Sequence, residues 1–222
     1  WAAVAAVDGL VQLGEPAVSG LLEQLDLNNY TARSWAIRAL AGIGDPRGLV
    51  TLLGAATADF SMSVRRAAAK GLGSMKWNHF PPTLLEVVQT EALEALLFVA
   101  QNDEEWVVRY AAVVGLESLA MALQPTNSPG WAKIQEQFAL MAEQENYLSV
   151  RARVWKAQQA VQEATFYVST SPSTEHPSLL ATDWEEILER LYNRKLRERT
   201  VLSEGDPRNY AELLSSVPGG RA

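Results

Sequence analysis

The chain has 222 residues, of which 48% are hydrophobic, and a formal net charge of −7. This length and apolar content suffice for a sizeable core in one or two domains. The negative charge argues against nucleic-acid binding, which needs a basic surface. The absence of cysteine excludes disulfides, thiolate zinc sites and a cysteine nucleophile within the chain.

The sequence also predicts a soluble, cytoplasmic protein with no membrane partner. No apolar run approaches the length of a membrane span, and the opening WAAVAAVDGL lacks the basic flank of a signal peptide. Because Trp1 already lies inside a helical pattern, we expect residues of the natural protein to precede it.

An internal repeat runs through the first 165 or so residues. Four segments share the frame [AV]-R-x-x-[AV], and their arginines are spaced 32, 44 and 42 residues apart, at Arg33, Arg65, Arg109 and Arg151. A degenerate copy at residues 2–14 carries Ala3 in place of the arginine. Such spacings are typical of helical hairpins joined by loops of variable length.

Each copy predicts a first helix that ends at a glycine, such as Gly14 or Gly44, and a second helix that follows it. The second helices are expected at residues 16–25, 46–56 and 83–101. Glu15 and Asp45 are N-cap candidates for the first two, and each precedes a proline. Alanine and glycine at the packing positions let neighbouring helices approach closely. We therefore predict an all-α, HEAT-like α-solenoid (α-α superhelix) of about five helical hairpins over residues 1–164, with one concave face.

The remaining residues are predicted to form a separate tail. Residues 165–182 are rich in Ser, Thr and Pro and are expected to form a linker, and residues 183–222 a C-terminal helical extension. Its main helix is predicted over 183–202, capped at Asp183, with a short helix over 210–217. The tail could dock on the solenoid, contact a partner or be a species-specific extension.

Candidate ligand-binding residues gather around the second and third copies, where cations and aromatic rings are concentrated. They are Tyr30, Arg33, Trp35, Asp45, Arg47, Asp59, Phe60, Arg65 and Arg66. A repeated arginine can serve structure, by reaching the acidic cap or carbonyls of a neighbouring hairpin. We favour that interpretation for Arg109 and Arg151, whereas both roles stay open for Arg33 and Arg65. Guanidinium groups also bind carboxylates at two points, so a ligand with carboxylates and an extended π-system would suit this face.

No catalytic residue is identified. The two histidines, His79 and His176, lie too far apart in sequence to suggest a metal site, and no Ser-His-Asp order or phosphate-binding glycine loop is present. From the residues alone the chain is a scaffold that binds a protein, a ligand or both.

Three segments, NNYTARSWAIRALAGIGDPRGL, DFSMSVRRAAAKGLGSMKW and DEEWVVRYAAVVGLESLA, resemble the E/F-type phycobilin lyase family, on its F-subunit side. The resemblance covers about residues 2–160, and the tail from about residue 166 does not match. It implies a heterodimer with an E subunit, itself a HEAT-like solenoid. That heterodimer attaches a bilin, commonly phycocyanobilin, through a thioether to a cysteine of a phycobiliprotein, commonly the phycocyanin α subunit. The bilin is the substrate, and no cofactor is expected.

The resemblance gives the candidate residues roles, because the reacting thiol belongs to the acceptor and the lyase has only to bind and orient the bilin. We expect the candidate arginines to pair with the bilin propionates, Asp45 or Asp59 to meet the pyrrole N–H groups, and the candidate aromatics to pack the rings. Relatives that isomerise the bilin carry His-Cys where Tyr30-Thr31 stands, so isomerisation is not expected. Two alternatives remain: a non-catalytic HEAT-like phycobiliprotein-binding protein, for example in phycobilisome degradation, and a generic protein-interaction solenoid.

Overall fold

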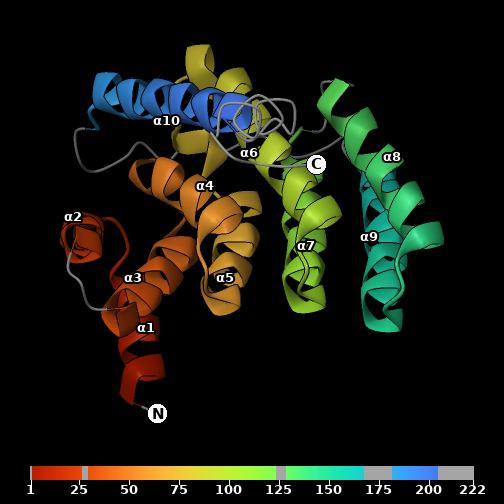
Figure 1. Ribbon diagram of the computed structural model, residues 1–222, viewed down its shortest axis with the longest axis horizontal. Coiled ribbons are helices and arrows are strands. Elements are labelled where there is room, and N and C mark those ends of the chain that lie inside the picture. Colours follow the sequence, from red (N-terminus) through yellow and green to blue (C-terminus); the bar gives the residue numbers. More distant parts are fainter. Residues whose placement is uncertain (1, 27–29, 124–128, 168–181, 205–222) are drawn as a thin grey trace, which may run out of the picture. The chain divides into compact units, whose positions relative to one another are not determined.

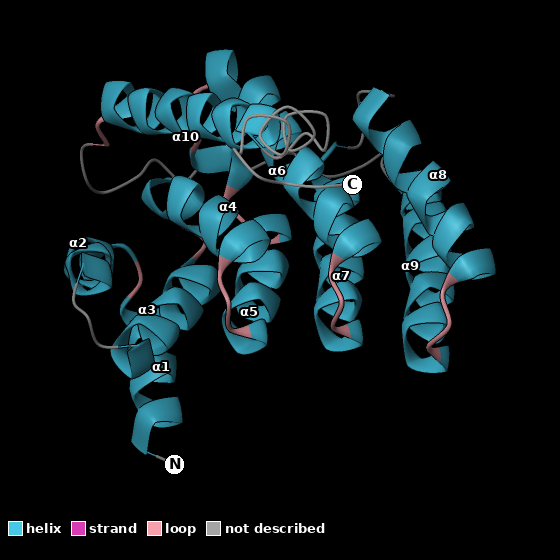
Figure 2. Ribbon diagram, in the orientation of Figure 1, coloured by secondary structure: helices cyan, strands magenta, loops and turns pink. Residues whose placement is uncertain are grey.

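The computed structural model describes residues 2–26, 30–123, 129–167 and 182–204, which contain helices and no strand. Figure 2 shows these helices and the short loops between them. The prediction of an all-α chain is confirmed. Contacts within the chain divide it into two units, Trp1–Thr182 and Asp183–Ala222.

The first unit alternates the first and second helices of successive hairpins (Figure 1). The first helices are α1 (Ala2–Leu13), α3 (Tyr30–Ile43), α5 (Met62–Gly73), α7 (Trp106–Leu123) and α9 (Leu148–Tyr167). The second helices are α2 (Val18–Glu23), α4 (Leu49–Ala58), α6 (Pro82–Asn102) and α8 (Pro129–Gln144). Each first helix packs on the next one, and α4, α6 and α8 form a second layer. Among the described residues, four hairpins are complete and the expected fifth consists of α9 alone.

The predicted helix ends are confirmed at both glycines. Gly14 and Gly44 have φ values of 71° and 68°, the left-handed conformation in which a helix commonly ends. The following prolines lie in short 3-10 turns, η1 (Glu15–Ala17) and η3 (Pro46–Gly48), rather than in the α-helices themselves. Further 3-10 turns lie at η2 (Gln24–Asp26) and η4 (Trp77–His79).

The two predicted acidic caps behave differently. Asp45 caps η3 by accepting the backbone N–H of Arg47 at 3.0 Å, as expected. The prediction for Glu15 is wrong, because Gly14 occupies the N-cap position and no side chain caps η1. The longer Glu15 side chain instead places Oε1 3.3 Å from Nδ1 of His79.

Close approach between first helices depends on glycine. A Cβ atom on Gly73 would overlap the backbone of Gly115, and one on Gly115 would overlap the carbonyl oxygen of Ala69. Helices α5 and α7 therefore cross with their backbones in direct contact, which only residues without a side chain permit. Leucine and valine fill the space between the layers, and Leu52 and Val64 are fully buried.

Helix α7 is the one helix in the described part of the chain that is long and apolar enough to cross a membrane. The expectation that no apolar run reaches such a length was therefore wrong for α7. Its place in the array explains this composition, since α7 packs against α5, α6, α8 and α9. Val108, Ala112 and Leu116 are fully buried there, as they would be in the core helix of a globular domain.

The second unit contains helix α10 (Trp184–Glu204). The Asp183 side chain accepts the backbone N–H of Glu186 at 3.0 Å, so the predicted cap is confirmed. The helix expected over 210–217 and most of the linker expected over 165–182 lie outside the described residues.

Candidate functional site

Three of the four repeated arginines reach from the start of one first helix to an acidic residue in the turn before the next. Arg33 lies 3.0 Å from Asp59, Arg65 2.6 Å from Asp103 and Arg109 2.7 Å from Glu145. We call these three pairs the arginine ladder. Because each arginine lies near the start of a first helix and its acid lies in the turn before the next first helix, the ladder follows one edge of the solenoid.

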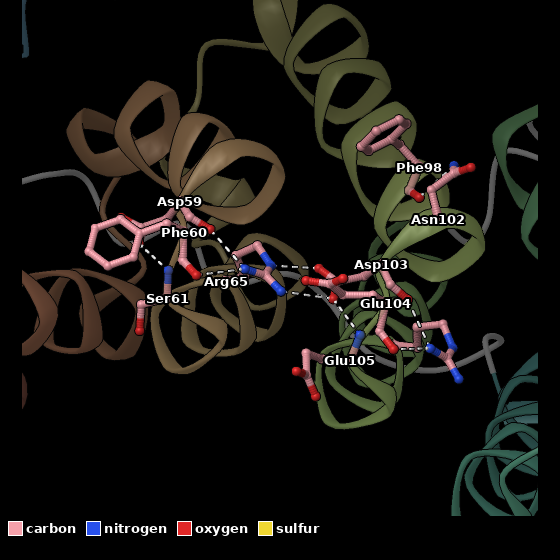
Figure 3. Close-up of polar contacts among 10 residues, drawn as sticks. Asp59, Phe60, Ser61, Arg65, Phe98, Asn102, Asp103, Glu104 and Glu105 are labelled. Carbon is pink, nitrogen blue, oxygen red and sulfur yellow. Dashed lines mark hydrogen bonds and ion pairs between the residues drawn. The ribbon is translucent and has the colours of Figure 1, made fainter.

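Arg65 also binds the turn that precedes its own helix (Figure 3). Its Nη1 donates to the carbonyl oxygens of Asp59 and Phe60 at 2.9 and 3.2 Å, while Nε and Nη2 bind both carboxylate oxygens of Asp103. These hydrogen bonds to Asp103 raise the pKa of Arg65 above its usual value. Arg65 thus joins two turns that lie far apart in sequence.

Arg109 repeats this arrangement one hairpin further on. It donates to the carbonyl oxygens of Asp103 and Glu104 at 2.8 and 3.1 Å, and to both carboxylate oxygens of Glu145. The hydrogen bond from Arg109 lowers the pKa of Glu145. The structural role that we predicted for Arg109 is therefore confirmed, and Arg65 shares it.

The sequence also carries a signal for the ladder, which the predicted site did not use. An acidic residue stands six positions before each of the last three repeated arginines, at Asp59, Asp103 and Glu145. Each of these carboxylates accepts the backbone N–H two residues further on, at 2.9 to 3.0 Å, and so fixes its own turn. This repeated spacing marks Asp103 and Glu145 as members of the repeat, but each binds the arginine of the preceding copy and not the one six positions further on.

A shallow groove of about 300 Å³ lies between the ends of α4 and α6, beside the Arg65–Asp103 pair. Its lining consists of Thr57, Ala58, Asp59, Arg65, Phe98, Val99, Asn102, Asp103 and Glu104. Two of these residues, Asp59 and Arg65, belong to the predicted site. The exposed Phe98 ring was not singled out from the sequence.

Four predicted residues meet at the turn between α4 and α5, namely Arg33, Asp59, Phe60 and Arg65. The Arg33 guanidinium lies over the Phe60 ring, 5.6 Å from its centroid, in addition to its ion pair with Asp59. Phe60 is 75% exposed, so this ring offers an open aromatic surface beside a cation.

Arg66 and Trp35 lie on the solvent-facing sides of neighbouring first helices. On α5 the exposed positions recur every four residues, at Met62, Arg66, Lys70 and Ser74, so the two cations lie on one stripe. On α3, the half-buried Trp35 ring lies under Arg38, whose guanidinium is 4.8 Å from its centroid.

Asp45 and Arg47 form a separate group at the opposite end of α3. Arg47 donates to both Asp45 oxygens at 2.8 and 2.9 Å and to the carbonyl oxygen of Glu15 at 3.0 Å. The hydrogen bonds to Asp45 raise the pKa of Arg47. Helix α3 has 14 residues and is therefore about 20 Å long, so this pair lies far from the Arg33 end. Six of the predicted residues thus form two groups, Trp35 and Arg66 lie apart from both, and the side chain of Tyr30 lies outside the described residues.

Comparison with known proteins identifies the family. A model of HEAT repeats matches residues 18–117. The phycocyanobilin lyase subunit beta of Pseudanabaena tenuis is 57% identical over 227 residues, which cover 97% of this chain and 80% of that protein. The chain belongs to the phycocyanobilin lyase subunit family.

Other relatives of this lyase subunit agree with that assignment. The phycocyanin alpha phycocyanobilin lyase CpcF of Synechocystis sp. is 54% identical over 128 residues, covering 58% of this chain and 59% of that protein. The structure of the complex of CpcE and CpcF of phycocyanin lyase from Nostoc sp. matches with a TM-score of 0.64 and 46% identity. That match covers 71% of this chain and 89% of the other. The α-solenoid fold is thereby confirmed.

The similarity to the Pseudanabaena relative also corrects one expectation. We expected the resemblance to end near residue 160. The alignment with the Pseudanabaena protein covers 97% of this chain, however, and must therefore include most of residues 183–222. The C-terminal extension is therefore shared with another member of the family and is not specific to one species.

Proposed function

We propose that this chain is the F-type subunit of a two-subunit lyase that attaches phycocyanobilin to a cysteine of the phycocyanin α subunit. The observation that carries the proposal is the 57% identity, over nearly the whole chain, to a phycocyanobilin lyase subunit. The name of the Synechocystis relative supports phycocyanin α as the acceptor, and the CpcE–CpcF complex supports an E-type partner.

The chemistry requires little covalent participation from this chain, which contains no cysteine. The acceptor thiol adds across the exocyclic ethylidene double bond of the bilin: a carbon–sulfur bond forms at the ethylidene carbon, the thiol proton ends on the tetrapyrrole, and no group leaves. Neither an oxidant nor a further cofactor is needed. The lyase accelerates this addition by holding the bilin extended and next to the thiol.

We divide the predicted site into residues that contact the bilin and residues that hold the solenoid together. Arg65 and Arg47 are bonded to carboxylates that are almost buried, and releasing such a pair costs about 3–5 kcal/mol. A propionate would have to compensate for that cost, so these two arginines and Asp45 are assigned to structure. Asp59 is engaged similarly, by Arg33 and by the N–H of Ser61.

The bilin contacts are assigned to the accessible members of the set. We assign Arg66, which shares an exposed stripe with Lys70, to a propionate, because its guanidinium is accessible. We assign Arg33 and the exposed Phe60 to the conjugated rings, because they form an accessible cation and aromatic surface. Tyr30 and Trp35 remain predicted ring contacts.

The experiment is co-expression with an E-type subunit, phycocyanobilin and apo-phycocyanin α, reading covalent product as a visible band on a denaturing gel. We expect Arg66→Ala to reduce product at unchanged folding. The matched control is Lys133→Ala, which removes an exposed cation from α8 and should leave the yield unchanged. Equal yields from the two variants would contradict the role of Arg66. Binding of phycobiliprotein without product, with any E-type partner, would favour the non-catalytic alternative.

The proposal places the reaction in the cytoplasm, where a chain without cysteine needs no oxidative folding. Fractionation of cells that express a tagged chain tests this placement, and recovery of the chain with membranes would contradict it.

A further inference from the structure

Helix α9 is the last first helix of the array, and it departs from the earlier ones in two independent ways. The first concerns burial. Ile37, Ala69 and Val113 occupy equivalent positions on α3, α5 and α7, counted from the repeated arginine, and they are 3%, 0% and 0% exposed. In each case the following first helix packs against the helix that carries this residue. The equivalent residue of α9 is Trp155, which is 54% exposed.

The second departure concerns the arginine ladder. Arg151 is the fourth repeated arginine, and the three before it each bind an acidic residue of the next turn. Within the described part of the chain no such turn follows α9, and the Arg151 side chain makes no hydrogen bond or ion pair there, whereas its backbone N–H bonds the carbonyl oxygen of Tyr147. Its Nε atom is nevertheless inaccessible to solvent. A buried N–H without an acceptor is costly, and here the cost falls on Nε alone, because Arg151 as a whole is half-buried.

These two residues lie on one stripe of α9. Leu148, Arg151, Ala152 and Trp155 follow the three-and-four spacing that places side chains on the same helix face, and we call them the end patch. Leu148 is 70% exposed, so the patch combines two large apolar side chains with a cation. One and two helical turns after Trp155, the exposed residues on this stripe are Gln159 and Gln162. Polar side chains of this kind are expected on the outer face of the last helix of a solenoid. Along this stripe, the first half of α9 therefore carries one polar side chain, Arg151, beside two large apolar ones.

The end patch is also held in a fixed position. Arg153, on the opposite side of α9 from the patch, binds Glu117 of α7 at 2.6 Å and is 9% exposed. This contact anchors the start of α9 to its neighbour. The patch is thus preformed, which lowers the entropic cost of binding a partner.

We propose that the end patch docks the E-type subunit, which continues the array across the subunit boundary. The docking segment has an Asp or Glu in a turn before a helix, which binds Arg151 as Asp103 binds Arg65, and an apolar side chain that covers Trp155. The identification of the partner as an E-type subunit rests on the proposed function. The acidic residue expected in its docking segment is inferred separately, from the pairs of the arginine ladder. A second copy of this chain fits poorly, because its ladder acids Asp59, Asp103 and Glu145 already bind its own arginines.

The test measures the affinity of the purified full chain for the E-type subunit by calorimetry. We expect Trp155→Ala and Arg151→Glu each to weaken binding by about tenfold or more, as truncation of an interface Trp or Arg typically does. Gln159→Ala is the matched control on the same helix and should leave the affinity within about twofold. Unchanged thermal midpoints of the isolated variants show that they fold, and replacing the partner acid by Arg should restore binding of Arg151→Glu.

Three results would overturn the proposal: wild-type affinity in both patch variants, no change in hydrogen exchange over residues 148–156 when the E-type subunit binds, or a homodimer that Trp155→Ala dissociates. The last would indicate a second copy as the occupant. The proposed function fails separately, when the two subunits assemble with wild-type affinity yet yield no bilin-linked phycocyanin α.

Discussion

Replacing Arg65 by Met should destabilise the protein far more than the same replacement of Arg66, its neighbour in sequence. Arg65 makes two hydrogen bonds to Asp103 and two to backbone carbonyls of the turn before α5. The side chains of Arg65 and Asp103 are 12% and 7% exposed. Arg65→Met therefore leaves a nearly buried carboxylate without its charged partner.

The expected cost follows from these contacts. Breaking a buried ion pair by removing one partner costs about 3–5 kcal/mol, and partial solvent access at this edge reduces that to about 3 kcal/mol. For a unit of this size, that loss lowers the thermal midpoint by roughly 6–12 °C. Arg66 is exposed, so Arg66→Met should change the free energy of unfolding by less than about 0.5 kcal/mol.

Thermal and urea unfolding followed by circular dichroism measure both variants. A double-mutant cycle with Asp103→Asn isolates the pair, and its coupling energy should exceed about 1 kcal/mol. Equal midpoints for the Arg65 and Arg66 variants, or a coupling energy near zero, would refute the structural role of the ladder. In that case Arg65 would again be a candidate for the bilin propionates.

Three further perturbations test other features of the fold. The hydrogen bond from Arg109 lowers the pKa of Glu145. The ionised Glu145 therefore contributes its full stabilisation of the fold above the usual glutamate pKa of about 4.3, and this contribution is lost as the pH falls through the lowered pKa. The stability difference between wild type and Glu145→Gln, measured by urea unfolding, should therefore narrow below about pH 4, and a constant difference would contradict this. A methyl group on Gly73 overlaps the α7 backbone and should cost about 1–3 kcal/mol, whereas Gly54→Ala, in open space on α4, should be neutral or stabilising; equal midpoints would exclude the close helix crossing. Asp45→Ala should cost about 3–5 kcal/mol, because it removes both the cap of η3 and the buried partner of Arg47, and Asp45→Asn should cost less, because asparagine still caps; equal losses would assign the effect to the ion pair alone.

Much of the solenoid could be predicted from the sequence, because the decisive interactions are local. Helical periodicity, the glycines that end α1 and α3 and the Asp45 cap involve residues within four positions of one another. The number of hairpins was harder to predict, since the last copy of the repeat pattern supplies α9 without a second helix among the described residues. Glu15 was misassigned because its side chain extends towards His79, 64 residues further along the chain, with Oε1 3.3 Å from Nδ1.

The sequence by itself determined that the chain is an array of helical hairpins with repeated arginines, and which of its segments resemble a lyase family. Only the tertiary structure decided which cations are available to a ligand. Arg65 and Arg66 are adjacent in sequence, but one is bonded to Asp103 across two turns and the other faces solvent. Likewise Val113 and Trp155 occupy equivalent positions, and only Val113 is covered. The physical reason is that a guanidinium's partner and an apolar side chain's burial depend on which helix packs next to it, and local sequence does not encode that neighbour.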